Sequence, residues 1–453
     1  MEKPQRFTSD ELSEVNKSLT FGTWRIQKPW KPLIITDAEG VYFTDSNGKK
    51  YIDFSSQLMC SNLGHKNQRV IEAIKRQAET LPFVSPAFGT EVRAELAKKL
   101  REVLPQNLTK YFFGTSGTEA NEAAVKIIRM YFAKEGRTKI ISRYNSYHGS
   151  TGASVELTGD FRRIAVESTG SFPGVVHVPD PYCYRCPFGL QYPECGVACA
   201  DYVEYAIKNE GNVGGVIVEP VTGTNGVIVP PKEYLPKLRE ITREHDVFLV
   251  ADEVMSGWGR TGEWFAVDNW KVKPDVLTTA KGITGAYAPL SLTATNQTLA
   301  DFFDDHYFAH GHTYEAHPLT LAAGVAAIEE YQEKNLVTRS KSLGDHLGKR
   351  LNELFLRHAS VGDVRGLGLF WAVELVKNRK TKEPFNTYWD KIQGKPLVVD
   401  KVAQAMMQKG VYVNTWVSHF VIAPPFIITE AEMDHAVDVM DECLAIADKE
   451  VLA

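Results

Sequence analysis

The chain has 453 residues, of which 43% are hydrophobic and 24% are charged, and its formal net charge at pH 7 is −5. This length supports a large hydrophobic core and more than one domain, and the acidic balance argues against nucleic acid or an anionic membrane as a partner. No apolar stretch reaches the roughly 18 residues of a membrane span. The polar start at residues 1–5 lacks the apolar core of a secretion signal, so we expect a cytoplasmic protein.

Helices and short strands are predicted for the first hundred residues. An entry helix precedes two strand-like runs at 33–36 and 40–45. Helical periodicity then extends from 66 to 104, with a break marked by Pro82 and Pro86. The pattern changes at about residue 110, where short apolar runs begin to alternate with amphipathic stretches.

The alternating region predicts one large sheet. Its strand-length apolar runs lie at 110–113, 138–142, 174–178, 214–218, 247–251, 275–279 and 290–294. Seven strands separated by helices predict an open, mostly parallel sheet covered by helices on both faces.

The rest of the chain predicts a smaller α+β unit. A helix-rich connector at 320–350 is followed by strand-like runs at 361–376 and 411–428, and a helix at 430–448 closes the chain. The predicted fold class is therefore α/β, with a large domain built on the seven-stranded sheet and a smaller α+β domain built from both termini. The expected boundaries are 1–65 for the N-terminal segment of the small domain, 66–325 for the large domain and 326–453 for the C-terminal part of the small domain.

Four of the six cysteines cluster in a Pro- and Gly-rich stretch, as Cys183, Cys186, Cys195 and Cys199. Their spacing is compatible with a tetrahedral zinc site, with two disulfides or with reduced thiols. The gap between the inner pair is shorter than in common zinc ribbons. We predict no metal site and leave the state of the cysteines open.

Three charged residues lie at the ends of apolar runs. Glu219 and Asp252 end two of these runs, and Lys281 follows a third after small residues. The carboxyl ends of neighbouring parallel strands meet at one edge of a sheet, so we expect these side chains to converge. A lysine buried there has a lowered pKa and can act as a nucleophilic amine that forms a Schiff base. Taken alone, Lys281 would more simply be a surface lysine after a buried strand.

Residues 112–121 predict a strand, a turn of small residues and the start of a helix. Backbone N–H groups at the helix N-terminus, near Gly117, can hold a phosphate together with the Ser116 and Thr118 hydroxyls. The Gly-Lys-Ser/Thr ending of a P-loop and the three-glycine dinucleotide spacing are both absent. An ordinary capped helix is the alternative. Tyr147 follows the next strand, where an aromatic ring can stack on a planar ligand.

Several short motifs occur together in one order along the chain. They are Gly114-Thr115-Ser116-Gly117-Thr118-Glu119-Ala120-Asn121, Tyr147-His148-Gly149, Glu219-Pro220, Asp252-Glu253-Val254, Gly257-Trp258-Gly259-Arg260-Thr261-Gly262, Ala280-Lys281-Gly282 and Gly311-His312-Thr313-Tyr314. This ordered set, within about residues 30–445, resembles the class III aminotransferases, which are pyridoxal-phosphate enzymes of the type I fold. Each motif alone is weak, whereas the ordered set is highly specific.

The resemblance implies roles around one cofactor, pyridoxal 5′-phosphate. Lys281 would hold it as a Schiff base and then shuttle a proton, and Asp252 would pair with the pyridine nitrogen. Tyr147 would stack on one ring face and Val254 would pack on the other. Thr313 would reach the phosphate of the neighbouring subunit, which implies a homodimer or tetramer with shared sites. The residues implied to bind the cofactor are Ser116, Gly117, Thr118, Tyr147, His148, Glu219, Asp252, Val254, Lys281 and Thr313.

The substrate side departs from the family. Two arginines that members use for substrate carboxylates are replaced by Val421 and Asn414, and Met255 stands where many members carry glutamine. The acid group must then be held otherwise, with Arg162 or Arg163, His419, Trp24 and Trp416 as candidates. The substrate residues we predict are Trp24, Leu58, Met59, Arg163, Glu219 and His419.

Trp24, Leu58, Met59 and Met255 predict an apolar substrate pocket. Such a pocket favours a donor whose amine lies on a terminal carbon. The stretches 362–370 and 381–384 look more like the taurine and β-alanine aminotransferases than the ornithine group. We therefore expect transfer of an amino group from a taurine-like or β-alanine-like ω-amino acid to a 2-oxo acid, such as 2-oxoglutarate or pyruvate, by a ping-pong mechanism. The alternatives are an amine:pyruvate or GABA-type transaminase, another reaction on the same cofactor such as that of an aminomutase or racemase, or a non-catalytic protein that kept the fold.

Overall fold

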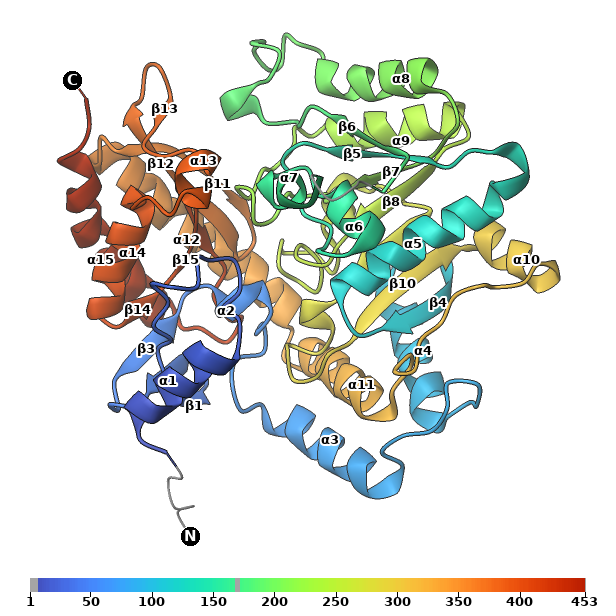
Figure 1. Ribbon diagram of the computed structural model, residues 1–453, viewed down its shortest axis with the longest axis horizontal. Helices are drawn as coiled ribbons and strands as arrows, with labels where there is room; N and C mark the ends of the chain where they lie inside the picture. The colour runs from blue at the N-terminus through green and yellow to red at the C-terminus, as the bar shows by residue number, and fades with distance from the viewer. Residues whose placement is uncertain (1–6, 168–171, 453) are drawn as a thin grey trace.

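The computed structural model describes residues 7–167 and 172–452. One part of the molecule is built on a large sheet covered by helices, and the two ends of the chain come together beside it on smaller sheets (Figure 1). The large sheet determines where the charged strand ends meet.

The large sheet has seven strands in the order β4-β10-β9-β8-β7-β5-β6. Neighbouring strands are parallel, except that β10 runs antiparallel to both β4 and β9. The strands are β4 Leu108–Gly114, β5 Lys139–Arg143, β6 Val175–Val178, β7 Val213–Val218, β8 Phe248–Asp252, β9 Val276–Thr279 and β10 Ser291–Asn296. Each predicted apolar run corresponds to one of these strands, so the predicted α/β fold with a mostly parallel sheet is confirmed.

Helices cover both faces of this sheet because the strands are apolar on both sides. Successive residues of a strand point to opposite faces, and on β5 Ile140 packs in the cluster with α5 while Ile141 packs in the cluster with α8 and α9. On β7, Val216 and Ile217 alternate in the same way. The helices of this part are α3 Gln68–Thr80, α4 Glu91–Val103, α5 Gly117–Tyr131, α6 Gly152–Leu157, α7 Phe161–Glu167, α8 Ala198–Glu210, α9 Tyr234–Glu244, α10 Gln297–Asp305 and α11 Pro318–Glu333.

The smaller sheets combine both ends of the chain. A four-stranded sheet has the order β1-β2-β3-β14, and its N-terminal β3 pairs in parallel with the C-terminal β14. A second sheet has the order β11-β12-β16-β15, with β13 paired to β12. The strands are β1 Ile35–Glu39, β2 Tyr42–Asp45, β3 Lys50–Asp53, β11 Val361–Leu367, β12 Phe370–Asn378, β13 Glu383–Pro384, β14 Val411–Tyr412, β15 Asn414–Trp416 and β16 His419–Ile422. The predicted smaller α+β unit built from both termini is confirmed, and we keep 65 and 325 as proposed domain boundaries.

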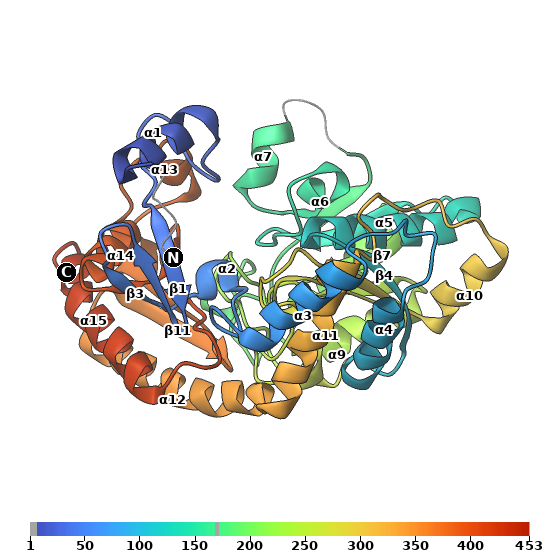
Figure 2. The ribbon, with the colours of Figure 1, turned by 90° about the horizontal axis from the view of Figure 1, so that it is seen from below.

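Helix α12 joins the two parts of the molecule. Figure 2 shows it extending from α11 beneath the smaller sheets toward α15. The helices of this part are α1 Ser9–Leu19, α2 Ser56–Met59, α12 Leu336–Arg357, α13 Tyr388–Ile392, α14 Val398–Gln408 and α15 Glu430–Asp448. Helix α15 has the predicted bounds because Thr429 and Glu432 form a capping box at its start. None of the helices in the described ranges combines the length and hydropathy that a membrane crossing requires.

Arg260 ties the two parts together from inside the molecule. It is fully buried, and its Nη1 donates hydrogen bonds to the carbonyl oxygens of Leu369 at 2.9 Å and Pro424 at 2.8 Å. Its Nη2 donates to Ser56 and to Asn62. Burial lowers the pKa of Arg260 to about 10, and no carboxylate within the described ranges pairs with it.

Replacing Arg260 with methionine should lower the free energy of unfolding by about 3 kcal/mol, because four buried acceptors lose their donor. Chemical denaturation measures this loss. The matched control Arg357→Met removes a guanidinium that is 48% exposed and pairs with surface carboxylates, and it should cost less than about 1 kcal/mol. Equal losses in both variants would contradict a structural role for Arg260.

Candidate active site

The three charged residues predicted at strand ends line one pocket. Strands β7, β8 and β9 are parallel neighbours, so Glu219, Asp252 and Lys281 reach the same edge of the sheet. The pocket is open to solvent and has a cavity volume of about 190 Å³. It is lined by Gly117, Thr118, Asn121, Tyr147, His148, Gly149, Glu219, Asp252, Val254, Met255, Ala280 and Lys281.

Lys281 enters this pocket from an unusual backbone conformation. It begins the short 3-10 helix η4 Lys281–Ile283 directly after β9, and its φ of 47° lies in the left-handed region, which is costly for a residue with a side chain. Burial lowers the pKa of Lys281, while the charges of Cys60, Asp252 and Glu219 act in the opposite direction. A lowered pKa increases the fraction of neutral amine, which is the nucleophilic form.

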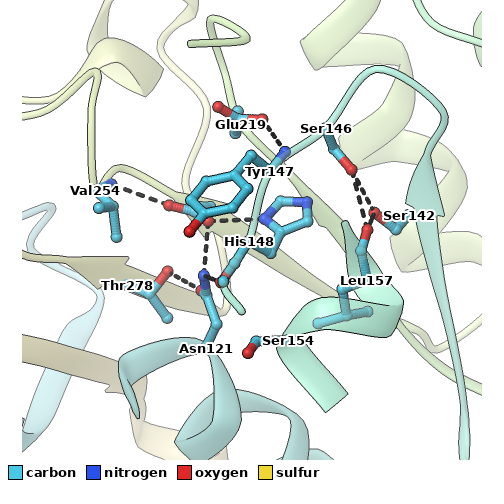
Figure 3. A network of polar contacts seen from close by, with 12 residues as sticks. Asn121, Ser142, Ser146, Tyr147, His148, Ser154, Leu157, Glu219, Val254 and Thr278 are labelled. Atoms are coloured by element: carbon cyan, nitrogen blue, oxygen red, sulfur yellow. Dashed lines mark hydrogen bonds and ion pairs between the residues drawn. The ribbon is translucent and has the colours of Figure 1, made fainter. Parts of the chain in front are cut away.

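A hydrogen-bond network holds the Asp252 carboxylate in one orientation. Its Oδ2 accepts from Asn121 Nδ2 at 2.8 Å and lies 2.7 Å from His148 Nδ1, while its Oδ1 accepts from the Val254 amide at 3.0 Å. Asn121 in turn accepts from the Thr278 hydroxyl at 2.6 Å. Figure 3 shows Asn121, His148 and Val254 converging on this point. The network directs a buried negative charge toward the pocket.

Glu219 is held by backbone amides rather than by a cation. Its Oε1 accepts from the Tyr147 amide at 3.0 Å and its Oε2 from the Gly223 amide at 2.8 Å. Burial raises the pKa of Glu219. No arginine side chain in the described part of the chain forms an ion pair with this carboxylate.

The first turn of α5 contributes Gly117 and Thr118 to the pocket wall. Ser116 caps this helix by accepting from the Glu119 amide at 3.2 Å, and the amides of Gly117 and Thr118 have no acceptor within the helix. A Cβ atom at Gly117 would lie only 2.7 Å from Val254 Cγ1, so glycine is needed for this close approach. Amides at a helix N-terminus favour an anionic ligand.

The residues present fit pyridoxal 5′-phosphate. An aldehyde can react with the Lys281 amine, a protonated pyridine nitrogen matches the Asp252 carboxylate, and a phosphate matches the first turn of α5. Tyr147 adds an aromatic ring to the pocket wall. The fold and this pocket together define an enzyme of the pyridoxal-phosphate class.

Comparison with known proteins identifies the family. The family model described as aminotransferase class-III matches residues 26–444. A putrescine–pyruvate aminotransferase of Pseudomonas aeruginosa is 36% identical over 431 residues, which cover 93% of this chain and 92% of that protein. A leucine/methionine racemase of Thermococcus litoralis is 35% identical over 422 residues, which cover 92% of this chain and 91% of that protein.

A solved structure extends this comparison. It is a taurine:2-oxoglutarate aminotransferase from Bifidobacterium kashiwanohense in complex with PLP and glutamate, and it is 34% identical with a TM-score of 0.93. The alignment covers 99% of this chain and 100% of that chain. The chain belongs to the class-III aminotransferases. The family and the pyridoxal-phosphate cofactor expected from the ordered motifs are therefore confirmed.

The predicted substrate residues fall into two groups. Trp24 is half exposed, and its ring meets the Tyr147 ring edge-on at 5.9 Å. Met59 is buried in one cluster with Met255, whereas Leu58 points outward and is 57% exposed. Trp24 and Met59 therefore lie beside the pocket residues Tyr147 and Met255, whereas Leu58 is not part of the pocket lining.

Arg163, His419 and Thr313 do not line the pocket of this chain. Arg163 lies close enough to His177 to lower its pKa, which burial lowers most strongly, to about 4. His419 is buried on β16, with its Nε2 3.0 Å from the Thr224 carbonyl oxygen. Thr313 is exposed.

Two functional features were not predicted from the sequence. The first is Asn121, which supports Asp252. The sequence could have indicated it, because Asn121 is a polar residue on the face of α5 that also carries the buried Ala120 and Ala124. The second is the pairing of Asp160 with Arg162. The sequence has two adjacent arginines, Arg162 and Arg163, and does not show which of them pairs with Asp160.

The four clustered cysteines are free thiols that surround one small cavity away from Lys281. Burial raises the pKa of Cys199 to about 12, so its thiol stays protonated. Among residues 7–167 and 172–452, no three His, Cys, Asp or Glu side chains are arranged to hold a metal ion.

Replacing Asp252 with asparagine should lower kcat by at least about 100-fold, because an amide lacks the negative charge that stabilises a protonated pyridine. Steady-state kinetics measure the loss. Glu253→Gln is the matched control: Glu253 accepts from Ser256 and from the Val267 amide, away from the pocket, and this variant should stay within a few-fold of the wild-type kcat. A wild-type kcat for Asp252→Asn would refute the assignment.

Glu253 should also make stability depend on pH. Burial raises its pKa from 4.5 to about 7, so between these values the folded chain retains a proton that the unfolded chain releases. The stabilising contribution of Glu253 is therefore complete below pH 4.5 and is lost as the pH rises through 7. As the pH rises from 4.5 to 7, the free energy of unfolding of Glu253→Gln should increase relative to that of wild type by on the order of 3 kcal/mol. Denaturation at each pH measures this difference. A difference that does not vary with pH would show that the pKa is not raised.

Proposed function

We propose that this aminotransferase moves an amino group from a terminal-amine donor, a taurine-like or β-alanine-like ω-amino acid, to a 2-oxo acid such as 2-oxoglutarate or pyruvate by a ping-pong mechanism. The observation that carries the proposal is the Lys281 amine, with its lowered pKa, facing the Asp252 carboxylate in one pocket. Met59 and Met255 make the adjoining wall apolar, which suits a short donor with few polar groups near its amine. Relatives named for putrescine and for taurine support a terminal amine.

The proposed roles follow from the geometry. Neutral Lys281 accepts the proton from the amine-bearing carbon of the donor and later returns a proton. Asp252 keeps its charge directed into the pocket because Asn121 and Val254 fix its oxygens. Tyr147 covers one side of the pocket and limits the access of water. When bound, pyridoxal phosphate supplies the electron sink of the reaction.

The remaining cofactor contacts belong to the same proposal. Ser116, Gly117 and Thr118 would hold the phosphate, and Tyr147 and Val254 would pack on the two faces of the ring. His148 would support Asp252, which it contacts. Thr313 would complete the site of a neighbouring subunit in a homodimer or tetramer.

Exposed aromatic residues support such a subunit contact. Tyr314, next to Thr313, is exposed and packs against Phe83 at 6.3 Å between ring centroids. Phe88 and Tyr307 are also exposed. Large apolar side chains exposed together are typical of interaction surfaces.

A second candidate is racemisation or another reaction on the same cofactor. It is favoured by the racemase relative, whose identity to this chain is 35%, against 36% for the putrescine–pyruvate aminotransferase. The two reactions differ in their need for an acceptor, since a racemase returns the amino group to the same molecule. The alternatives of an amine:pyruvate or a GABA-type transaminase are tested by including their donors in the same experiment.

Purified enzyme should be offered taurine, β-alanine, GABA, ornithine and 1-phenylethylamine, each with pyruvate and with 2-oxoglutarate. The proposal expects conversion of a terminal-amine acid that requires a 2-oxo acid, with parallel lines in double-reciprocal plots. Racemisation of an α-amino acid without any acceptor would favour the second candidate.

The Lys281→Ala variant tests the assignment of Lys281 as the nucleophile and proton carrier. It should lose at least about 1,000-fold in activity, because both the nucleophile and the proton carrier are removed. Borohydride treatment of wild type should attach the cofactor mass to the peptide containing Lys281. Attachment to another lysine, or an active Lys281→Ala enzyme, would refute the assignment.

A further inference from the structure

Arg162 places a positive charge beside the wall of the Lys281 pocket. The central carbon of its guanidinium lies 3.9 Å from the ring centroid of Tyr147, 4.4 Å from that of Trp416 and 5.1 Å from that of Trp24. Tyr147 lines the pocket, whereas the two tryptophans come from the smaller part of the molecule. Arg162 therefore lies where the two parts meet at the pocket.

Asp160 fixes the orientation of this guanidinium. Arg162 Nε lies 3.0 Å from both carboxylate oxygens, and Nη2 donates a further hydrogen bond to Oδ2. Both side chains are nearly buried, with 7% of Arg162 and 0% of Asp160 exposed. Within residues 7–167 and 172–452, Arg162 Nη1 donates to no protein acceptor. One nitrogen of an oriented, charged donor is thus left for a ligand.

The surrounding charges favour an anion. The charge of Arg162 contributes, after burial, to lowering the pKa of Lys281. It acts in the same way, after burial, on the pKa of Lys391, whose ammonium lies 4.9 Å from the Trp416 ring. Two cations therefore lie at the Trp416 ring, where Asp160 is bonded to Arg162 and the charge of Asp400 acts on Lys391.

The next residue along the chain points elsewhere. Arg163 acts on His177 and does not line the pocket. The arginines that other family members use are replaced by Asn414 and Val421. Of these positions, Arg162 alone combines a charge with contact to a pocket residue.

We propose that Arg162 binds the acid group of both substrates, namely the carboxylate of the 2-oxo acid and the carboxylate or sulfonate of the donor. The inference rests on the proposed function. Nη1 donates a charge-assisted hydrogen bond to an acid oxygen, and the surrounding aromatic rings exclude water and so strengthen it. Asp160 is a positioning residue that holds the guanidinium in place.

The test measures acid binding separately from turnover. Glutarate and 2-hydroxyethanesulfonate carry an acid group but neither an amine nor a keto group, and their binding to cofactor-loaded enzyme is followed by tryptophan fluorescence and calorimetry. Arg162→Met should weaken both by at least about 10-fold, as expected for the loss of a hydrogen bond to a charged group. Arg162→Lys, which keeps the charge without the planar fork, should weaken them less. The matched control Arg163→Met should bind both probes as wild type does.

Kinetics provide a second readout. Arg162→Met should raise KM for the 2-oxo acid. The turnover rate with 1-phenylethylamine, a donor without an acid group, should fall by a smaller factor. Circular dichroism verifies that each variant is folded. If Arg162→Met does not fold, weakened probe binding in Arg162→Lys still supports the proposal, and wild-type binding in that variant overturns it.

The outcomes separate this inference from the proposed function. Unchanged probe binding in Arg162→Met, or an equal loss in Arg163→Met, overturns the role of Arg162. A loss confined to Lys391→Met assigns the acid group to Lys391 and overturns it as well. Probe binding lost in Arg162→Met, in an enzyme that transfers no amino group, would retain the acid site and reject the proposed function.

Discussion

Burial of the Lys281 amine beside the Asp252 carboxylate is the constraint on which the pocket depends. Desolvation lowers the pKa of the lysine, and the nearby carboxylates limit how far it falls. The two residues are brought together by β8 and β9, which are parallel neighbours in the large sheet. The rest of the pocket is built around this pair, from the left-handed backbone of Lys281 to the first turn of α5.

A buried carboxylate requires partners, and this structure provides them from three elements. Asn121 comes from α5, His148 from the segment after β5, and the Val254 amide from the turn after β8. Since each partner is itself buried or hydrogen-bonded, the orientation of Asp252 is set before any ligand arrives. Preorganised charge of this kind is effective in catalysis because it needs no rearrangement during the reaction.

Two buried arginines connect the large sheet to the smaller sheets, and they differ in what they bind. Both terminal nitrogens of Arg260 donate to carbonyl, hydroxyl and amide oxygens of the protein, so this arginine has a structural role. Arg162 is held by one carboxylate and by aromatic rings from both parts, and its Nη1 donates to no acceptor in the described ranges. The junction between the two parts therefore stabilises the fold at one point and provides a cation for recognition at another.

The sequence by itself determined the strands of the large sheet, the bounds of α15, the family and the identity of Lys281 and Asp252 as central residues. These features are local: apolar runs, a capping box at Thr429 and motifs in a fixed order. Only the tertiary structure decided that Asn121 supports Asp252 and that Arg162 packs on the ring of the pocket residue Tyr147. The direction of Arg162 depends on Trp24 and Trp416, which are distant in the chain and meet α7 only after the two ends of the chain have packed together.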